Sequence, residues 1–380
     1  MAYSSSLWEH DSFLKYNYII IGSGITGLSA ACSLLEHQAH ARVLILERGL
    51  LPSGASTRNA GFACFGSPGE ILSDLKIMNE NEVMNLVASR YQGLQLLRKR
   101  LGDEALGFEE KGGHEPIPNG VVISDAELHY LNDLLAPIFN GKVFTRKTNL
   151  LTDYGLNKKY FSDLIFNPFE AQIHSGKMME ALLKKAASLG AKIITGCMVE
   201  KLEETNIGMS VIVHDHHNHS MLTFKADKVA VCTNGFAKQF FPDKDILPAR
   251  GQVLVSEKIP HLLVNGTFHV DEGYIYFRDV EGRLLIGGAR NLDILGEQST
   301  EFEANEKIIS FLKQFAIENI LHQRECNFEF QWSGIMGVGA NKIPIIEQVS
   351  DKIIAGIRMG GMGVALGTSS GEKVAKLLAN

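Results

Sequence analysis

The first hundred residues alternate between short apolar runs and longer helical stretches. Residues 18–21 form a short β-branched run and residues 43–46 form a second, each typical of a buried parallel strand. Between them, residues 28–35 carry apolar positions at helical spacing, with small residues that favour close packing. The order strand, helix, strand predicts a βαβ unit of a parallel sheet.

The rest of the chain predicts two kinds of structure. Patterns that belong with the first unit lie at residues 178–189, 192–195, 198–202, 211–213, 221–224, 228–232, 352–355 and 364–378. Residues 72–101 predict one long helix with a charged face. Residues 107–165 and 245–325 are richer in strand, turn and amphipathic helix, so we expect a second domain inserted into the first. The predicted fold class is α/β, or α+β overall.

Composition excludes several classes of protein. The chain has 380 residues, 45% hydrophobic and 21% charged, unlike a disordered, coiled-coil or collagen-like chain. At about 150 residues per domain, this length predicts two to three domains. The net charge of −6 argues against nucleic acid as a partner, because phosphate binding needs clustered positive charge. Five scattered cysteines, no signal-peptide pattern and no run of about 18 apolar residues predict a cytoplasmic protein without an integral membrane segment.

A glycine-rich loop follows the first strand directly. It reads Gly22, Ser23, Gly24, Ile25, Thr26 and Gly27. Glu47 ends the second strand 20 residues after Gly27, which is the spacing of a dinucleotide-binding fingerprint. Because Gly24 has no Cβ, the backbone can approach a pyrophosphate, and the helix that follows offers free N–H groups to the phosphates. Glu47 would accept hydrogen bonds from ribose hydroxyls.

A second loop, rich in glycine and hydroxyl groups, follows a few residues beyond Glu47. With the preceding Arg48, its expected cofactor-binding residues are Gly54, Ala55, Ser56, Arg58, Asn59, Ala60 and Gly61. Small residues and backbone donors here suit a cofactor that extends far beyond its adenosine, which favours FAD over NAD. The alternative is an ordinary surface loop, because the same residue types favour turns.

These motifs resemble those of the D-amino-acid oxidase-like FAD-dependent oxidoreductases, which include glycine oxidase, sarcosine oxidase and γ-glutamylputrescine oxidase. The resemblance covers nearly the whole chain. It rests on the two loops and on residues 176–204, 226–235, 250–252, 332–334 and 355–363. It implies a Rossmann-like FAD-binding domain interleaved with a mainly antiparallel-sheet substrate domain.

The resemblance also assigns segments and residues. It gives the FAD-binding domain residues 1–95, 171–240 and 331–380, and the substrate domain residues 96–170 and 241–330. Beyond the two loops, it places at the cofactor Val199, Thr233, Asn234, Gly235, Gly334, Ile335, Gly361, Met362, Gly363 and Val364. The helix that begins at this last glycine turn would place its partial positive charge beside reduced flavin.

The substrate site is expected beside residues 273–278. Their alternation as a strand puts Tyr276 and Arg278 on one face, which the resemblance turns toward the substrate; the alternative is an exposed hairpin face. Glycine oxidase-like members hold the substrate carboxylate with an arginine where this chain has Met336. That departure favours a simple or N-alkyl amine over an α-amino acid, unless Arg278 or Arg358 replaces the missing arginine.

Three further features are the mode of flavin attachment, the role of Trp332 and a cluster of histidines. No cysteine lies where sarcosine oxidase-like members attach flavin, so the FAD is expected to be non-covalent and Cys64 to be a small buried residue. Trp332 shares a face with Phe328 and Phe330, which favours core packing. We expect no metal site, because a solvated turn explains the crowded His214, His216, His217 and His219.

The leading interpretation is an FAD-dependent oxidoreductase that oxidises a C–N bond of an amine or amino acid. A hydride would pass to flavin N5, and the resulting imine would hydrolyse. Two alternatives stay open: an FAD dehydrogenase of a hydroxy acid or polyol, and a flavin-binding subunit that needs a partner protein. Oxygen, a quinone or a carrier protein would accept the electrons, and no catalytic acid or base is assigned.

Overall fold

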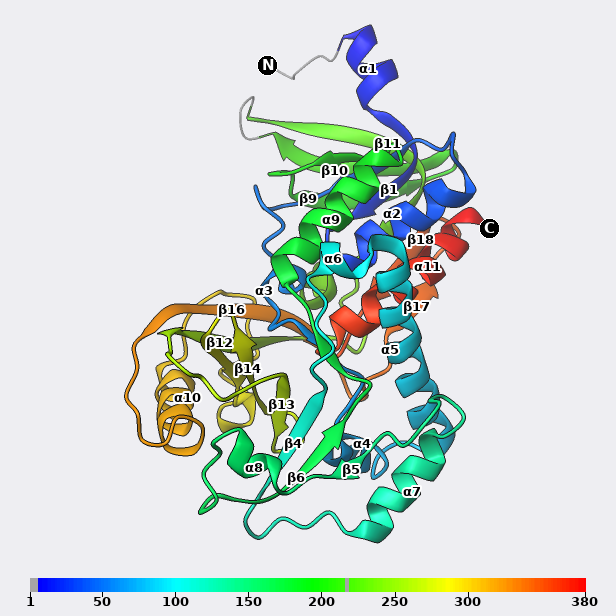
Figure 1. Cartoon of the computed structure of the whole chain (residues 1–380). Helices are drawn as coiled ribbons and strands as arrows, with labels where there is room; N and C mark the ends of the chain where they lie inside the picture. Colours follow the sequence, from blue (N-terminus) through cyan, green and yellow to red (C-terminus); the bar gives the residue numbers. More distant parts are fainter. Residues whose placement is uncertain (1–5, 216–218) are drawn as a thin grey trace.

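The computed structural model describes residues 6–215 and 219–380 and contains two large sheets, one in each half of the molecule (Figure 1). The first sheet has the order β17-β18-β11-β1-β2-β8, with β10 and β9 continuing from β11. Its strands are β1 (Lys15–Ile21), β2 (Val43–Leu46), β8 (Lys192–Ile194), β9 (Val199–Thr205), β10 (Gly208–Asp215), β11 (Ser220–Val231), β17 (Ile345–Gln348) and β18 (Ile353–Ile357). Parallel pairing from β18 through to β8 confirms the predicted Rossmann-like sheet.

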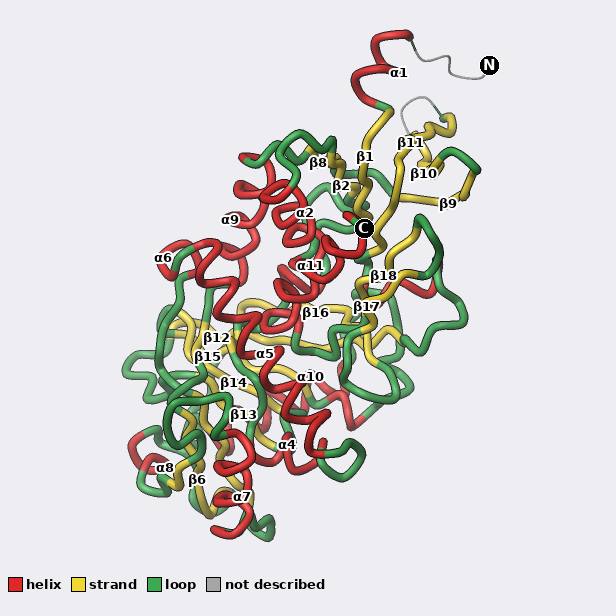
Figure 2. Tube along the Cα trace, turned by 90° about the vertical axis from the view of Figure 1, so that its right-hand side faces the viewer, coloured by secondary structure: helices red, strands yellow, loops and turns green. Residues whose placement is uncertain are grey.

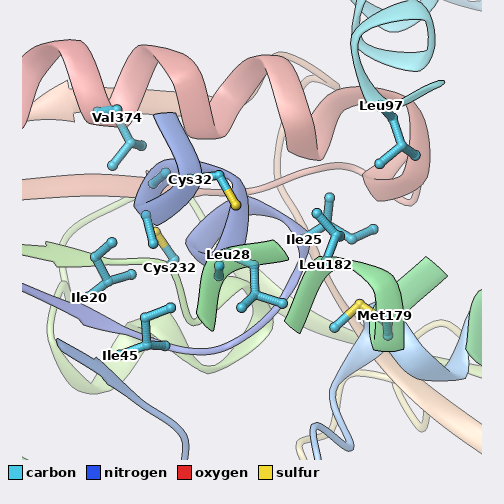
Figure 3. Close-up of a cluster of buried hydrophobic side chains, with 14 of the residues drawn as sticks. Ile20, Ile25, Leu28, Cys32, Ile45, Leu97, Met179, Leu182, Cys232 and Val374 are labelled. Carbon is cyan, nitrogen blue, oxygen red and sulfur yellow. The ribbon is translucent and has the colours of Figure 1, made fainter. Parts of the chain in front are cut away.

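Three helices cover one face of this sheet: α2 (Ile25–His37), α9 (Ser175–Ser188) and α11 (Gly363–Ala379). Because successive strand residues point to opposite faces, Ile20 and Ile45 pack against these helices in the cluster that Figure 3 shows. Ile19 and Leu44 pack instead toward β9, β10 and β11 on the other face. Burial on both faces explains why these strands form continuous apolar runs in the sequence.

The second sheet has the order β16-β12-β15-β14-β13-β4-β6-β5 and is antiparallel except between β13 and β4. Its strands are β4 (Gly113–Pro118), β5 (Thr145–Arg146), β6 (Phe161–Asn167), β12 (Leu247–Lys258), β13 (Thr267–Val270), β14 (Ile275–Val280), β15 (Arg283–Gly288) and β16 (Phe328–Val338). Helix α10 (Glu306–Asn319) packs against it. The predicted mainly antiparallel second sheet is confirmed, and β16 crosses the boundary predicted at residue 330.

Shorter elements lie before and between the strands and helices given above. They are α1 (Leu7–Phe13), α3 (Ala55–Arg58), β3 (Phe62–Ala63), α6 (Asp103–Leu106), α7 (Asp125–Leu135), α8 (Leu150–Asp153), β7 (Ala171–Gln172), η1 (Asn234–Gln239) and η2 (Arg290–Leu292). None of the helices in the described ranges combines the length and the apolar character that a membrane crossing requires.

Residues 72–101 do not form the single helix that their periodicity predicts. The chain forms α4 (Pro68–Asp74) and α5 (Glu80–Leu101) instead. The second helix starts at a capping box, in which the Asn79 side chain accepts from the Glu82 N–H and the Glu82 side chain accepts from the Asn79 N–H. The two ends of α5 pack into different hydrophobic clusters, so this helix links the two halves of the molecule (Figure 2).

The segments 221–224 and 228–232 are also not separate strands. They belong to one strand, β11, whose first half pairs with β10 and whose second half pairs with β18. His214 and His219 border the hairpin turn, whereas His216 and His217 lie outside the described residues.

His114 on β4 predicts a pH-dependent stability. Its Nδ1 lies 3.1 Å from the Thr267 carbonyl oxygen, its Nε2 lies 2.9 Å from the Tyr154 hydroxyl, and its ring stacks on Phe268. Both nitrogens are satisfied by a neutral ring that donates from Nδ1 and accepts at Nε2. Burial lowers the pKa of His114 to about 4, so its contribution to stability is complete above pH 6.5 and is lost as the pH falls toward 4.

We therefore expect His114→Phe to lose about 3 kcal/mol less stability than the wild type between pH values of about 7 and about 4. Urea unfolding of both proteins at the two pH values measures this difference. Equal losses in the two proteins would contradict a neutral buried His114.

Candidate active site

The loop between β1 and α2 has the geometry of a dinucleotide fingerprint. Gly22 has a φ of +101°, and a Cβ there would lie 2.9 Å from the Cys232 carbonyl oxygen. A Cβ at Gly27 would lie 2.1 Å from the Gly22 carbonyl oxygen. A Cβ at Gly24 would meet only the Ser56 side chain within 4 Å. Gly22 and Gly27 are thus required by the fold, whereas Gly24 keeps a space open at the start of α2.

Glu47 fixes this loop with both of its carboxylate oxygens. Oε2 accepts from the Ser23 N–H at 3.0 Å and from the Ser23 hydroxyl at 2.7 Å, and Oε1 accepts from the Gly49 N–H at 3.0 Å. The neighbouring Arg48 places its guanidinium 3.6 Å from the ring centroid of Phe236. Contact of Glu47 with a ribose stays a prediction, because the bonds seen here orient the loop itself.

The second loop, residues 54–61, lies across the start of α2. The Ser56 hydroxyl accepts from the Ile25 N–H at 3.0 Å. Asn59 Oδ1 accepts from the Gly61 N–H at 2.8 Å and from the Ser175 hydroxyl at 2.7 Å. These bonds hold the loop against both α2 and α9, so the two glycine-rich loops border the same space.

A cavity of about 460 Å³ begins at these loops and extends to the second sheet. Its lining includes the predicted cofactor residues Gly24, Ile25, Thr26, Ala55, Ser56, Arg58, Asn59, Ala60, Asn234, Gly334, Gly361, Met362, Gly363 and Val364. The predicted cofactor residues outside the lining are Gly22, Ser23, Gly27, Glu47, Arg48, Gly54, Gly61, Val199, Thr233, Gly235 and Ile335. More than half of the predicted set therefore meets in one cavity.

Four of the residues outside the lining are placed by their burial and backbone contacts. Val199 is buried at the start of β9, and Ile335 is buried on β16. A Cβ at Gly235 would lie 2.5 Å from the Met336 carbonyl oxygen, so the backbone of η1 touches that strand closely. Thr233 precedes η1, and its buried hydroxyl has no hydrogen-bond partner among the described residues.

Two helix N-termini meet at the cavity. Gly360 and Gly361, with φ of +57° and +83°, turn the chain into α11, whose first residues line the cavity beside those of α2. The two helices pack tightly, since a Cβ at Gly371 would lie 2.6 Å from Ser29 Cβ. Neither helix has a side-chain N-cap. Both ends therefore direct backbone N–H groups and partial positive charge toward one region.

These features fit the FAD that the sequence predicts. A Cβ at Gly54 would meet no atom within 4 Å, and a Cβ at Gly24 would meet no backbone atom within that distance, so backbone can approach a phosphate from two sides. The hydroxyls of Thr233 and Ser333, each next in sequence to a lining residue, are buried without partners among the described residues, whereas buried hydroxyls usually have one. The two uncapped helix ends suit a diphosphate.

The second sheet forms the opposite wall. The ring of Tyr276 on β14 lies against Gly287, where a Cβ would stand 2.7 Å from the tyrosine hydroxyl. Phe62 meets this ring edge-on, with centroids 5.5 Å apart, and Met336 lines the same space. Burial raises the pKa of Tyr276, so its hydroxyl remains a proton donor. Two of the four predicted substrate residues, Tyr276 and Met336, therefore do line the cavity.

The other two, Arg278 and Arg358, do not line it. Arg278 Nη1 donates to the carbonyl oxygens of Gly61 at 2.7 Å and Ile173 at 2.8 Å, which fastens the second glycine loop to the sheet. Arg358 forms an ion pair with Asp245 at 2.6 Å. This corrects the expectation that either arginine faces the substrate. Strand alternation predicts the face on which a long side chain starts, but not the direction in which it turns.

Trp332 only partly follows its predicted core role. Its indole N–H donates to the Arg58 carbonyl oxygen at 2.9 Å, and it packs beside Val253. Phe330, expected on the same buried face, is 55% exposed. The tryptophan thus supports the second glycine loop more than the core.

Buried ionisable groups that the sequence patterns missed gather at the cavity, where Cys64 and His269 belong to the lining. Cys64, Glu170 and His269 are buried, with ligand-type atoms within 4.8 Å of one another. His269 Nε2 and Glu170 Oε2 lie 3.6 Å apart, an ion-pair distance. Burial opposes the charge on His269, but Cys64 and Glu170 together raise its pKa well above the ordinary value. Cys64 is buried, as the sequence predicts, and this burial raises the pKa of its thiol.

A second such group lies at the outer end of the cavity. Lys342 Nζ lies 3.0 Å from Glu70 Oε1 and 2.8 Å from Asp74 Oδ1, and all three side chains line the cavity. Burial acts to raise the pKa of Glu70, but Lys342 and Arg90 outweigh it and hold that pKa below its ordinary value. No local sequence motif predicts that these residues meet, because α4 and the loop that carries Lys342 are far apart in the sequence.

Comparisons with known proteins agree with this architecture. Residues 17–377 match the family model described as "DAO: FAD dependent oxidoreductase". A probable oxidoreductase OrdL of Rhizobium meliloti is 25% identical over 383 residues, covering 96% of this chain and 83% of that protein. Glycine oxidase from Geobacillus kaustophilus has a TM-score of 0.75 at 20% identity, over 96% of this chain and 95% of that one. Iminodiacetate oxidase from Chelativorans has a TM-score of 0.74 at 18% identity, over 96% and 95% of the two chains.

Proposed function

Because the chain belongs to the DAO family of FAD-dependent oxidoreductases, we propose that it oxidises a C–N bond of a small amine or amino acid. The observation that carries this proposal is the single cavity that joins the two glycine loops to the second sheet. A dinucleotide held at Gly24 and a small molecule held beside Tyr276 would share that cavity. The solved structures of similar fold, a glycine oxidase and an iminodiacetate oxidase, support the substrate class by their names.

FAD, when bound, supplies the hydride acceptor. The two glycine loops and the α2 N-terminus would hold its phosphates, and the α11 N-terminus would favour negative charge that develops during reduction. Tyr276, Phe62 and Met336 would exclude water and orient the C–H bond of a substrate whose nitrogen is neutral. Loss of a hydride from the carbon next to nitrogen gives an imine, and water hydrolyses it to a carbonyl compound and an amine.

An anaerobic substrate panel tests this function directly. The purified flavoprotein is mixed with amines, amino acids and hydroxy acids, and the loss of visible flavin absorbance is recorded. We expect bleaching by a compound with an oxidisable C–N bond. Bleaching by hydroxy acids or polyols alone would overturn the proposal in favour of a hydroxy-acid dehydrogenase. Admitting air, a quinone or a carrier protein to the bleached enzyme would then identify the electron acceptor.

We further expect the FAD to be non-covalent, so that acid precipitation releases it intact into the supernatant. Two thiols line the cavity among the described residues: Cys232, and Cys64, whose sulfur lies 3.6 Å from that of Met362. The raised pKa of Cys64 keeps it a thiol, which is a poor nucleophile toward a flavin. Absorbance of the supernatant and of the redissolved pellet measures the two fractions. Yellow colour that stays in the pellet, and disappears in Cys64→Ser, would contradict this expectation.

A further inference from the structure

Arg290 lies on the cavity wall without a protein partner for its charge. It follows Gly288, whose φ is +100°, and Ala289, which is in the left-handed region with a φ of +55°. The Ala289 N–H donates to the Tyr274 carbonyl oxygen at 2.5 Å, and this turn brings Arg290 to the cavity at the end of β15. Its guanidinium makes no hydrogen bond or ion pair with any residue in the described ranges. A non-glycine residue at positive φ is uncommon, and here it positions a charged side chain.

Three carboxylates, one after Arg290 in its own loop and two in the turn before β14, have other partners. Asp271 Oδ2 accepts from Asn291 Nδ2 at 2.9 Å. Asp293 Oδ2 accepts from Asn305 Nδ2, also at 2.9 Å, and its Oδ1 accepts from a backbone N–H. Glu272 Oε2 accepts from the Ser73 hydroxyl at 2.7 Å. The positive charge of Arg290 is therefore left uncompensated by its own loop.

The other cations around the cavity are engaged as well. Arg58 Nη1 donates to the Ser333 carbonyl oxygen at 2.9 Å, and its guanidinium lies over the Phe302 ring. Lys342 is held by Glu70 and Asp74. Arg278 and Arg358 face away, as described above. Among the described residues of the cavity wall, Arg290 is thus the arginine whose fork remains available to a ligand.

Tyr276 supplies a second donor on the same wall. It lies on β14, directly opposite Gly287 of β15, and no hydrogen bond joins its hydroxyl to another of the described residues. Arg290 comes three residues after Gly287, just beyond the end of β15. An arginine fork and a phenol hydroxyl together match the donor pattern that a carboxylate accepts.

We propose that Arg290, together with the Tyr276 hydroxyl, binds a carboxylate of the substrate. The inference rests on the proposed function and deepens it: the substrate is an amine that also carries a carboxylate. This chain has Met336 where the related amino-acid oxidases have the arginine that binds the carboxylate. Arg290 provides a cation at a different position on the cavity wall. A cofactor phosphate is the less suitable ligand, because Arg290 follows β15 of the second sheet, while the loops at Gly24 and Ser56 follow β1 and β2 of the first.

The test is a ligand titration that requires no turnover. Benzoate and benzamide share a shape but differ in charge, and each is titrated into the FAD-bound protein while perturbation of the flavin spectrum is followed. We expect benzoate to bind the wild type more tightly than benzamide. Arg290→Met should weaken benzoate about 10- to 100-fold and leave benzamide nearly unchanged, and Arg290→Lys should recover part of the loss.

Arg283→Met is the matched control. Arg283 starts the same strand, β15, and pairs with Glu329 outside the cavity, so its removal changes the net charge of the protein equally. Equal weakening of benzoate in both variants would overturn the proposal. Loss of FAD from Arg290→Met, or no response of the wild type to benzoate, would overturn it as well. Failure of the proposed function is seen separately, as a substrate panel that bleaches nothing while the benzoate titration still depends on Arg290.

Discussion

Gly24→Val is expected to give a folded protein that no longer holds FAD. A Cβ at Gly24 would lie 2.9 Å from Ser56 Oγ and within 4 Å of no backbone atom, so a rotation of the Ser56 side chain, which gives up its bond to the Ile25 N–H, can relieve the contact without moving the backbone. The added methyl groups would instead fill the space at the α2 N-terminus, where the backbone must approach a pyrophosphate. We expect FAD affinity to fall by about 100-fold or more, since each 1.4 kcal/mol of lost binding is about tenfold. Flavin content after purification, and titration of the apoprotein with FAD, measure the loss.

Gly27→Val is the matched control for this experiment. Its Cβ would lie 2.1 Å from the Gly22 carbonyl oxygen, a backbone atom that cannot move aside without separating α2 from β1. We expect that variant to lose its fold, measured by circular dichroism and solubility, whereas Gly24→Val keeps it. Normal flavin occupancy in Gly24→Val would show that the loop does not hold the phosphates.

The nucleotide half could be predicted from the sequence because its determinants are local. Gly22, Gly27 and Glu47 act within one βαβ unit of about 30 residues, so spacing alone predicts their arrangement. Helix boundaries are harder to predict from the sequence. The break before Glu80 depends on side-chain to backbone hydrogen bonds at Asn79, which hydrophobic periodicity does not register.

The opposite wall could not be predicted in the same way. Glu70, His269, Arg290 and Lys342 come from four separate parts of the chain, and each is polar within an ordinary stretch of sequence. What brings them together is the pairing of the second sheet and the packing of α4 beneath it, which no short motif encodes. The strand pattern at Tyr276 correctly indicated a wall residue, but it wrongly suggested that Arg278 faces the substrate.

Glu297→Ala is expected to destabilise the protein by about 3 to 5 kcal/mol, the usual cost of breaking a buried ion pair. Glu297 is fully buried, and its Oε1 accepts from Arg250 Nη2 at 2.8 Å, while its Oε2 accepts from Gln252 Nε2 at 3.0 Å. The alanine variant would leave a buried guanidinium without its carboxylate. Urea unfolding of the two proteins measures the change.

This ion pair also explains the motif Arg250-Gly-Gln252, which the sequence singled out without a physical role. Both polar side chains of the motif bind Glu297, which lies between η2 and α10, so they hold the segment that follows Arg290 against β12. The double variant Arg250→Met, Glu297→Leu should regain most of the stability, since an apolar pair replaces the charges. If the loop positions Arg290 for a carboxylate, this stable variant should still bind benzoate more weakly than the wild type. Wild-type stability in Glu297→Ala itself would show that the buried charge pair does not hold the loop.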